Sequence, residues 1–491
     1  MRDIRATFVI PLLFLGVAYQ APMALAQPAG TFRATANMTT PRMFHTATLL
    51  PNGKVLIVGG YTSCDPTCRP AAGAELYDPA FGTFTPTGRM TAAYITGAVL
   101  LPDGRVLIAG TDSTHTVSSL EIYDPTSGTF NAAGKPATLT GGLSPTLLNG
   151  GRVLLSGTLG TFPPYVPGAE LYDPAAGTST PVANWPQYDV WSPLVLADGS
   201  VFLLSNDCDP EVYDAAAGTF RPLSSPYSGI VGSISHYYPA RSAISLLNGT
   251  VLFTGDNSFN NDRRAEFYDP ATGTFAPTGS LSTARNIHSA TLLPDGTALV
   301  AGGVGGYGSG NPPVASAEIY DPATSEFSAT GNLTSVRYAH TATLLNSGQV
   351  LLTGGSATPI SASSNAITSA ELYTPAVLVP APVLFSLSGD AKGQGAIWRS
   401  ATGQVASATS PAVAGEALSM CTTGVAHDGV IPPRISIGDR LAEILYFGPS
   451  GYPGYIQVNF RVPSGVAPGA AVSVRLTYLS RSSNAVTIGV R

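Results

Sequence analysis

Aromatic and basic side chains that interrupt a repeated pattern are the best candidates for ligand binding in this chain. The repeat is marked by a Glu-x-Tyr phrase that occurs seven times, with successive copies 41 to 55 residues apart. A residue shared by many repeats meets a structural need of each repeat, so a unique site should lie where the pattern is broken. The breaks fall mainly in the second, fourth and fifth repeats and supply these candidates: Tyr94, Tyr188, Trp191, His236, Tyr237, Arg241, Arg263 and Arg264.

These residue types suit recognition of a polar organic ligand. An aromatic face can stack on a sugar, and an arginine beside it can hold a carboxylate through two parallel hydrogen bonds. The alternative interpretation is that the aromatic side chains only pack against one another in the fold, because sequence does not separate exposed from buried aromatics. We expect the partner to be a glycan or another extracellular protein.

The residues that the repeats share are interpreted as structural. His45, His288 and His340 each follow an arginine by three residues, and we expect them to be hydrogen-bonded groups rather than metal ligands. We expect the glutamates of the seven phrases to be paired or hydrogen-bonded between strands: Glu75, Glu121, Glu170, Glu211, Glu266, Glu318 and Glu371.

Acidic residues cluster at 206–209 and 256–262, but neither cluster has the spacing of a calcium-binding loop. Capping of turns by Asp and Asn is the favoured interpretation. The sequence contains no Gly-x-Ser-x-Gly elbow and no zinc-binding histidine pair. We therefore predict no catalytic residue, no metal and no cofactor.

The secondary-structure elements that position these candidate binding residues are expected to be short β-strands. Each Glu-x-Tyr phrase follows two apolar runs joined by a tight turn such as Pro-Asp-Gly or Asn-Gly, and in three repeats it precedes Asp-Pro-x-x-Gly-Thr-Phe, with variants of that turn in three others. Each repeat is thus four antiparallel strands, and the period is that of a propeller blade. The seventh repeat lacks its own Gly-Thr-Phe strand, so Gly30-Thr31-Phe32 should complete that blade beside Tyr373. The prediction is an all-β, seven-bladed propeller over residues 27–378.

The phrases AELYDPAFGTF, AEFYDPATGTF and AEIYDPATSEF resemble bacterial kelch repeats, over residues 30 to 376. Residues 379–491 resemble the C-terminal β domain of secreted acidobacterial proteins, which implies a small β-sandwich-like domain. The kelch resemblance implies a galactose-oxidase-like propeller but little about chemistry, because such propellers include oxidases, an epimerase and binding proteins.

The alternative function is a copper radical oxidase or another carbohydrate-active propeller enzyme. The resemblance to copper radical oxidases implies an adjacent Tyr-His pair, a tyrosine crosslinked to cysteine, and a histidine from the C-terminal domain. This chain has no Tyr-His pair; it has Tyr338-Ala-His340, and His427 is its one histidine beyond that point. The main prediction is therefore a binding protein.

One face of the propeller should carry the ligand. The loops after the second and fourth strands of each blade share a face, and the loops between the second and third strands vary in length: 61–73, 111–119, 158–168, 206–210, 256–264, 304–316 and 356–368. Variable loops on a rigid ring commonly carry function, so this long-loop face is the predicted binding surface.

The N-terminus predicts export. Arg2 and Arg5, an apolar run and Ala24-Leu25-Ala26 form a secretory signal over residues 1–26, and no later run is long enough to span a membrane. We expect a secreted, periplasmic or cell-surface monomer. With a net charge of −6 and three lysines, nucleic acid is not an expected partner.

In an oxidising compartment Cys64 and Cys68 could form a disulfide across a tight loop. Cys208 and Cys421 are expected to be free thiols.

Overall fold

The computed structural model describes residues 30–64, 67–71, 73–113, 118–160, 166–185, 190–205, 210–223, 242–255, 263–305, 311–359, 364–426, 430–450 and 453–491. The predicted signal segment lies outside these residues. Within them, the structure contains no apolar helix of a length that would span a lipid bilayer.

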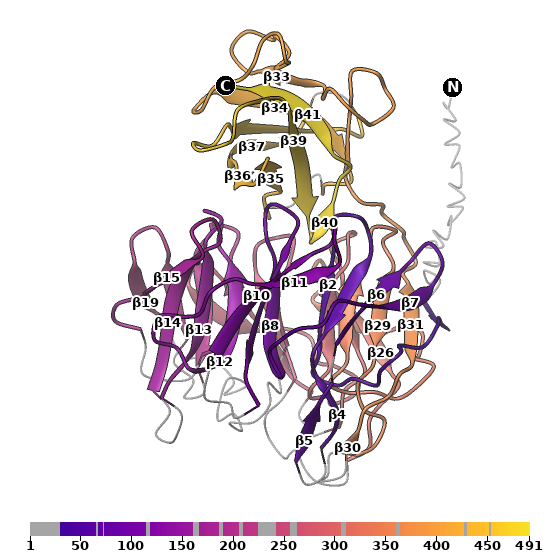
Figure 1. The fold of residues 1–491 in the computed structure, drawn as a ribbon. Coiled ribbons are helices and arrows are strands. Elements are labelled where there is room, and N and C mark those ends of the chain that lie inside the picture. The colour runs from indigo at the N-terminus through magenta and orange to yellow at the C-terminus, as the bar shows by residue number, and fades with distance from the viewer. Residues whose placement is uncertain are drawn as a thin grey trace, which may run out of the picture.

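The described residues form seven four-stranded antiparallel sheets arranged as the blades of a propeller (Figure 1). The first three blades are, in order, β2 (Thr46–Leu49), β3 (Val55–Val58), β6 (Ala74–Asp78) and β7 (Thr83–Thr87); β8 (Tyr94–Leu100), β9 (Val106–Thr111), β10 (Ser118–Asp124) and β11 (Thr129–Ala132); β12 (Gly141–Leu147), β13 (Val153–Leu159), β14 (Val166–Asp173) and β15 (Thr178–Pro181).

The fourth to sixth blades follow the same order: β16 (Val190–Val195), β17 (Val201–Ser205), β18 (Glu211–Asp214) and β19 (Thr219–Pro222); β20 (Ser242–Ser245), β21 (Val251–Thr254), β22 (Ala265–Asp269) and β23 (Thr274–Pro277); β24 (Ser289–Leu292), β25 (Ala298–Ala301), β26 (Ala317–Asp321) and β27 (Glu326–Ala329). The prediction of seven blades is confirmed.

The seventh blade closes the ring with the N-terminal strand. It contains β28 (Thr341–Leu344), β29 (Val350–Thr353), β31 (Ala370–Thr374) and β1 (Thr31–Ala34). Phe32 is opposite Tyr373 in the register, and their ring centroids are 4.7 Å apart. The predicted closure is therefore confirmed: the strand that precedes the first blade completes the last one and covers the edge of β31.

The Glu-x-Tyr phrase stabilises each blade through its tyrosine. These tyrosines are buried, and most of them pack on the Phe of the next strand, as in Tyr77 with Phe84 at 4.8 Å between centroids. The Tyr77 hydroxyl also lies 3.2 Å from Thr35 Oγ1 at the start of the ring. One side chain thus fills the core of its own blade and is hydrogen-bonded to the preceding segment, which explains its recurrence.

The Asp-Pro turn has the local chemistry expected for it. Asp78 Oδ1 accepts a hydrogen bond from Ala80 N at 3.0 Å, and Gly82 returns the chain at a positive φ of 64°. In the sixth blade Ser325 occupies the glycine position at φ 59°. The turn therefore depends on a left-handed residue, for which glycine has no steric cost.

The C-terminal domain is a sandwich of two five-stranded sheets. One contains β32 (Val383–Leu384), β33 (Ile397–Arg399), β34 (Ala417–Thr423), β37 (Glu443–Pro449) and β38 (Ile456–Arg461); the other contains β35 (Arg434–Ile437), β36 (Arg440–Leu441), β39 (Gly469–Tyr478), β40 (Arg481–Ser482) and β41 (Val486–Val490). Buried side chains such as Leu418, Phe460 and Val474 form its core.

The C-terminal domain covers the short-turn face of the propeller (Figure 1). Val430 N donates a hydrogen bond to Leu247 O at 2.8 Å, and Ala381 N donates one to Asn346 O at 2.9 Å. Leu479, at the tip of the β39–β40 hairpin, packs against the cores of both domains. The long-loop face is on the opposite side of the ring.

Candidate functional site

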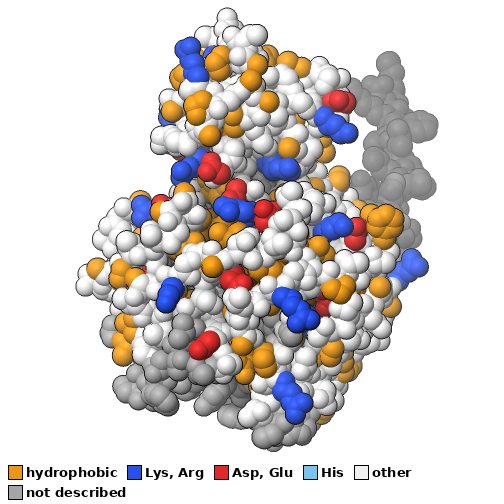
Figure 2. Space-filling view, in the orientation of Figure 1, with side chains coloured by type: hydrophobic (Ala, Val, Ile, Leu, Met, Phe, Trp, Pro, Cys, Tyr) orange, Lys and Arg blue, Asp and Glu red, His pale blue; other side chains and the backbone are white. Residues whose placement is uncertain are grey.

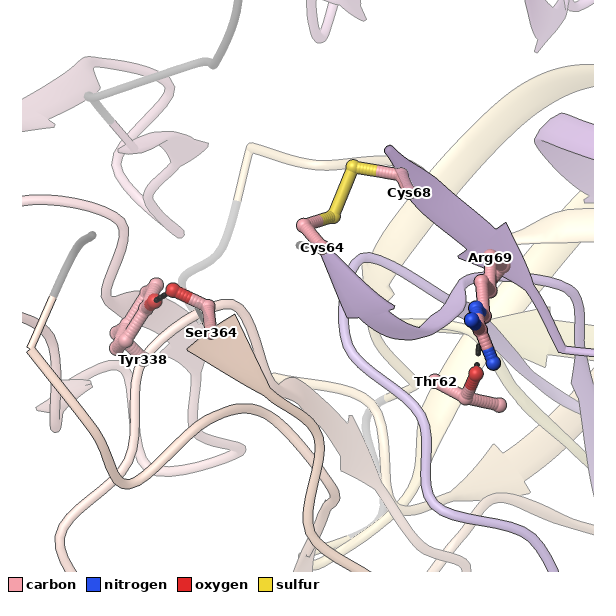
Figure 3. The surroundings of a disulfide bond; sticks show 6 residues. All are labelled: Thr62, Cys64, Cys68, Arg69, Tyr338 and Ser364. Carbon is pink, nitrogen blue, oxygen red and sulfur yellow. Dashed lines mark hydrogen bonds between the residues drawn. A yellow bond between two sulfur atoms is a disulfide. The ribbon is translucent and has the colours of Figure 1, made fainter. Parts of the chain in front are cut away.

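The long-loop face carries a small additional sheet. β4 (Tyr61–Cys64), β5 (Cys68–Pro70) and β30 (Ser364–Asn365) join the loops of the first and seventh blades and project away from the C-terminal domain (Figure 1). A disulfide joins Cys64 to Cys68 where β4 turns into β5 (Figure 3). The pairing of β4 with β30 joins the loops of the seventh and first blades, and the disulfide closes the loop of the first blade.

Only three of the eight predicted binding residues have described side chains: Tyr94, Arg263 and Arg264. Tyr94 starts β8 on the long-loop face, and its ring centroid lies 6.1 Å from that of Tyr61. Arg263 and Arg264 are exposed on the same face, just before β22, and Arg263 Nη1 donates a hydrogen bond to Ser282 O at 3.3 Å.

The other candidate residues lie wholly or partly outside the residues that the structure describes. Trp191 lies in β16, where its backbone pairs with Leu204, but its side chain is outside the described residues. Four more lie wholly outside them: Tyr188, His236, Tyr237 and Arg241. The acidic clusters at 206–209 and 256–262 and Cys208 are also outside, whereas Cys421 is a free thiol in the C-terminal domain.

An apolar cluster lies beside the disulfide, where the sixth, seventh and first blades meet. Its buried members are Met43, Ile287, Val304, Tyr338 and Ala339, and Phe44, Tyr61, Cys64 and Ala366 pack against it. Tyr338 is 2% exposed, and its hydroxyl donates a hydrogen bond to Ser364 Oγ at 2.9 Å (Figure 3).

The repeat pattern of the sequence did not indicate this cluster. Met43, Phe44 and Tyr338 lie between the repeated arginine and histidine of their blades, at positions whose residue type changes from blade to blade. The rule that function lies where the pattern breaks would have selected them, had it been applied within each repeat.

The repeated arginines are paired with the repeated glutamates. Arg42 Nε lies 3.1 Å from Glu75 Oε1, and Arg337 Nη2 lies 2.8 Å from Glu371 Oε1, with all four side chains at most 1% exposed. Arg337 Nη1 also donates to Gly354 O at 2.7 Å. Burial lowers the pKa of both arginines, and the glutamates oppose that effect. These glutamates are therefore structural in the described blades, as predicted from their repetition.

The repeated histidines connect neighbouring blades. His45 Nε2 is hydrogen-bonded to Thr353 Oγ1 of the preceding blade at 2.9 Å, and His340 Nε2 to Ser289 Oγ at 2.9 Å. His288 Nε2 makes the same kind of bond to Thr254 Oγ1 at 2.8 Å.

Burial, with the nearby arginine charges, lowers the pKa of His45 from 6.5 to about 3. Burial likewise lowers the pKa of His288 to about 3. These imidazoles are therefore neutral at pH 7 and act as hydrogen-bonding groups between blades.

The fold and this arrangement define a propeller with a galactose-oxidase-like architecture. Among solved structures, the chain is similar to a fungal alcohol oxidase of the AA5 family in complex with copper, with a TM-score of 0.58. The match has 17% sequence identity and covers 94% of this chain and 99% of the oxidase chain. No protein-family model matches the sequence, and no curated protein matches it. At that identity the similarity establishes the fold alone.

The described residues do not fit a copper centre of this kind. The Tyr338 hydroxyl is hydrogen-bonded to Ser364, and His340 Nε2 is hydrogen-bonded to Ser289. Cys64, which packs against the cluster that contains Tyr338, is held in a disulfide. Across the described ranges, no group of three His, Cys, Asp or Glu side chains is placed to hold a metal ion.

Proposed function

We propose that this protein is an exported recognition protein that binds a glycan or another extracellular protein on the long-loop face of its propeller. The observation that supports this most directly is the position of the C-terminal domain, which covers the short-turn face and leaves the opposite face open (Figure 1). On that face the two loops joined by β4 and β30 form a rigid base beside the neighbouring aromatic rings of Tyr61 and Tyr94.

The chemistry of this face suits stacking combined with anion recognition. Tyr61 and Tyr94 are both half-buried neighbours, and partly exposed aromatic rings of this kind are suited to stacking on a sugar. Arg263 and Arg264 add exposed positive charge on the same face. A glycan that carries a carboxylate would use both features.

A glycan array with the purified full chain tests this proposal. Tyr94→Ala and the double variant Arg263→Ala/Arg264→Ala should each weaken the binding signal at least about tenfold. The matched control is Phe81→Ala, because Phe81 is an aromatic residue that is 80% exposed in the turn between β6 and β7, on the covered side of the ring. Equal losses in all three variants, or none in the first two, would contradict the proposed face.

A copper radical oxidase is the second candidate. That the similar solved structure is a copper-containing alcohol oxidase supports this candidate more directly than it supports a binding role. Among the described residues no group of three His, Cys, Asp or Glu side chains is placed to hold a metal ion, and His236 and His427 lie outside those residues. Metal analysis after incubation with Cu(II), together with peroxide production from primary alcohols, separates the two. One tightly bound copper with turnover would establish the oxidase, and failure of both would leave the binding role.

A further inference from the structure

A cleft of about 810 Å³ lies between the C-terminal domain and the propeller, away from the long-loop face. On the propeller side it is lined by Asn149, Val195–Asp198 and Ser245, at the turns of the third and fourth blades and the end of β20. On the other side it is lined by residues 430–434 and 441–447. Figure 2 shows the surface hollowed between the two domains, with apolar, basic and acidic side chains around the hollow. A volume of this size accommodates a small organic ligand.

One wall of the cleft is apolar. β37 is the edge strand of its sheet, and its Leu445 and Tyr446 are 40% and 44% exposed. Val430 continues this wall and is 48% exposed. Large apolar side chains gathered at such exposure around a concave surface are typical of ligand sites.

Arg434 supplies a positive charge in the same cleft. Its Nη2 donates a hydrogen bond to Leu147 O at 3.3 Å, and no carboxylate lies within ion-pair distance of it among the described residues. Arg475 is near it on the same face of the sheet, because Arg434 pairs with Thr477 and Arg475 with Ser436. Burial lowers the pKa of both arginines, and no carboxylate of the described residues opposes that effect.

The propeller arginines differ from Arg434 in having acidic partners. Arg42 and Arg337 are also taken out of water, and each of them has a glutamate partner. A partly buried guanidinium that lacks such a partner still has N–H donors and a positive charge with which it can bind an anion.

The two acidic side chains that line the cleft are already engaged. Asp198 Oδ1 accepts hydrogen bonds from Ser200 N at 2.9 Å and from Ser200 Oγ at 2.6 Å. Glu443 Oε2 lies 2.8 Å from Arg461 Nε. Ser245 Oγ, by contrast, is buried without a hydrogen-bond partner in the described part of the chain. Among the described residues, the cleft therefore offers a ligand the guanidinium of Arg434, which has no carboxylate partner there, and the unpaired hydroxyl of Ser245.

We propose that this cleft binds a small amphipathic carboxylate, with the carboxylate on the Arg434 guanidinium and the apolar body against Val430, Leu445 and Tyr446. This site is separate from the long-loop face, and it brings residues of both domains onto one ligand. A ligand bound to both domains therefore stabilises the contact between them.

The test compares 2-naphthoate with its uncharged counterpart 2-naphthamide by titration calorimetry on the full chain. Naphthoate should bind about ten- to hundredfold more tightly than the amide, because only the acid forms charge-assisted hydrogen bonds with Arg434. Arg434→Gln should reduce naphthoate binding to the level of the amide and leave amide binding unchanged. The matched control Arg33→Gln removes the same charge from an exposed position in β1 and should change neither affinity.

A second variant keeps the test decisive if Arg434→Gln does not fold. Leu445→Asp places a carboxylate on the exposed apolar wall, and it should abolish naphthoate binding. Equal binding of acid and amide, unchanged naphthoate affinity in both variants, or no binding of naphthoate at about 1 mM would each overturn the proposal. This experiment does not depend on glycan binding at the long-loop face, so either proposal can be refuted without refuting the other.

Discussion

The buried histidines between blades make the stability of the propeller depend on pH in a specific window. In the folded protein the pKa of His45 is about 3, whereas the ordinary value of a histidine in an unfolded chain is about 6.5. Between these two values the unfolded chain binds a proton that the folded protein does not bind. The free energy of unfolding therefore falls as the pH is lowered from about 6.5 towards 3.

The size of the effect follows from the shift. Each pH unit within the window changes the free energy of unfolding by about 1.4 kcal/mol for one such histidine. Acidification from pH 7 to pH 5 should thus cost about 2 kcal/mol for His45 and a similar amount for His288, whose folded pKa is also about 3.

Denaturant-induced unfolding at the two pH values, followed by intrinsic fluorescence, measures this cost. In His45→Gln the side-chain amide can still donate to Thr353 Oγ1 but does not titrate. The variant should therefore lose about 2 kcal/mol less than the wild type on acidification. Groups that titrate elsewhere contribute equally to both proteins and cancel in the difference.

Thr353→Val is the matched control. It removes a hydrogen-bond partner of His45 but keeps the buried imidazole, so its loss on acidification should equal that of the wild type even if its stability at pH 7 is lower. An unchanged acid-induced loss in His45→Gln would refute the assignment of a buried neutral imidazole that resists protonation.

Three further predictions concern stability and domain contact. Arg337→Met should cost about 3–5 kcal/mol because it leaves the carboxylate of Glu371 buried without its cation, and adding Glu371→Leu should recover more than half of that in denaturant unfolding. No recovery in the double variant would contradict the pairing. Gly30→Ala should cost about 1–3 kcal/mol because a Cβ there would overlap the tyrosine ring at the closing strand, whereas Gly150→Ala, in open space, should not. Leu479→Asp should expose the segment between the domains to limited proteolysis, because this side chain packs against both cores; wild-type cleavage rates would contradict that role.

The sequence predicted the seven-bladed ring because the features that form each blade lie close together along the chain. The Glu-x-Tyr phrase, the Asp-Pro turn and the hairpin glycines each act within one blade, so seven copies predict seven blades. The missing strand of the last repeat even predicted the pairing of Phe32 with Tyr373, because strand composition alone identified the absent partner. The same repetition predicted that the shared glutamates and histidines are structural, whereas their arginine and threonine partners are known only from the structure.

The candidate site was predicted less completely. Tyr94 and the two arginines before β22 lie on the predicted face, but the neighbour of Tyr94 is Tyr61 in a loop of another blade. The cluster around Tyr338 combines residues from three blades, and no local pattern in the sequence indicates which residues of different repeats come into contact.

The sequence by itself determined the architecture of this protein, since strand alternation, turn chemistry and repetition act over a few residues at a time. Only the tertiary structure decided which face the C-terminal domain covers and that Arg434, opposite the turns of the third and fourth blades, has no acidic partner among the described residues. Both depend on packing between residues hundreds of positions apart, for which a single sequence carries no local signal.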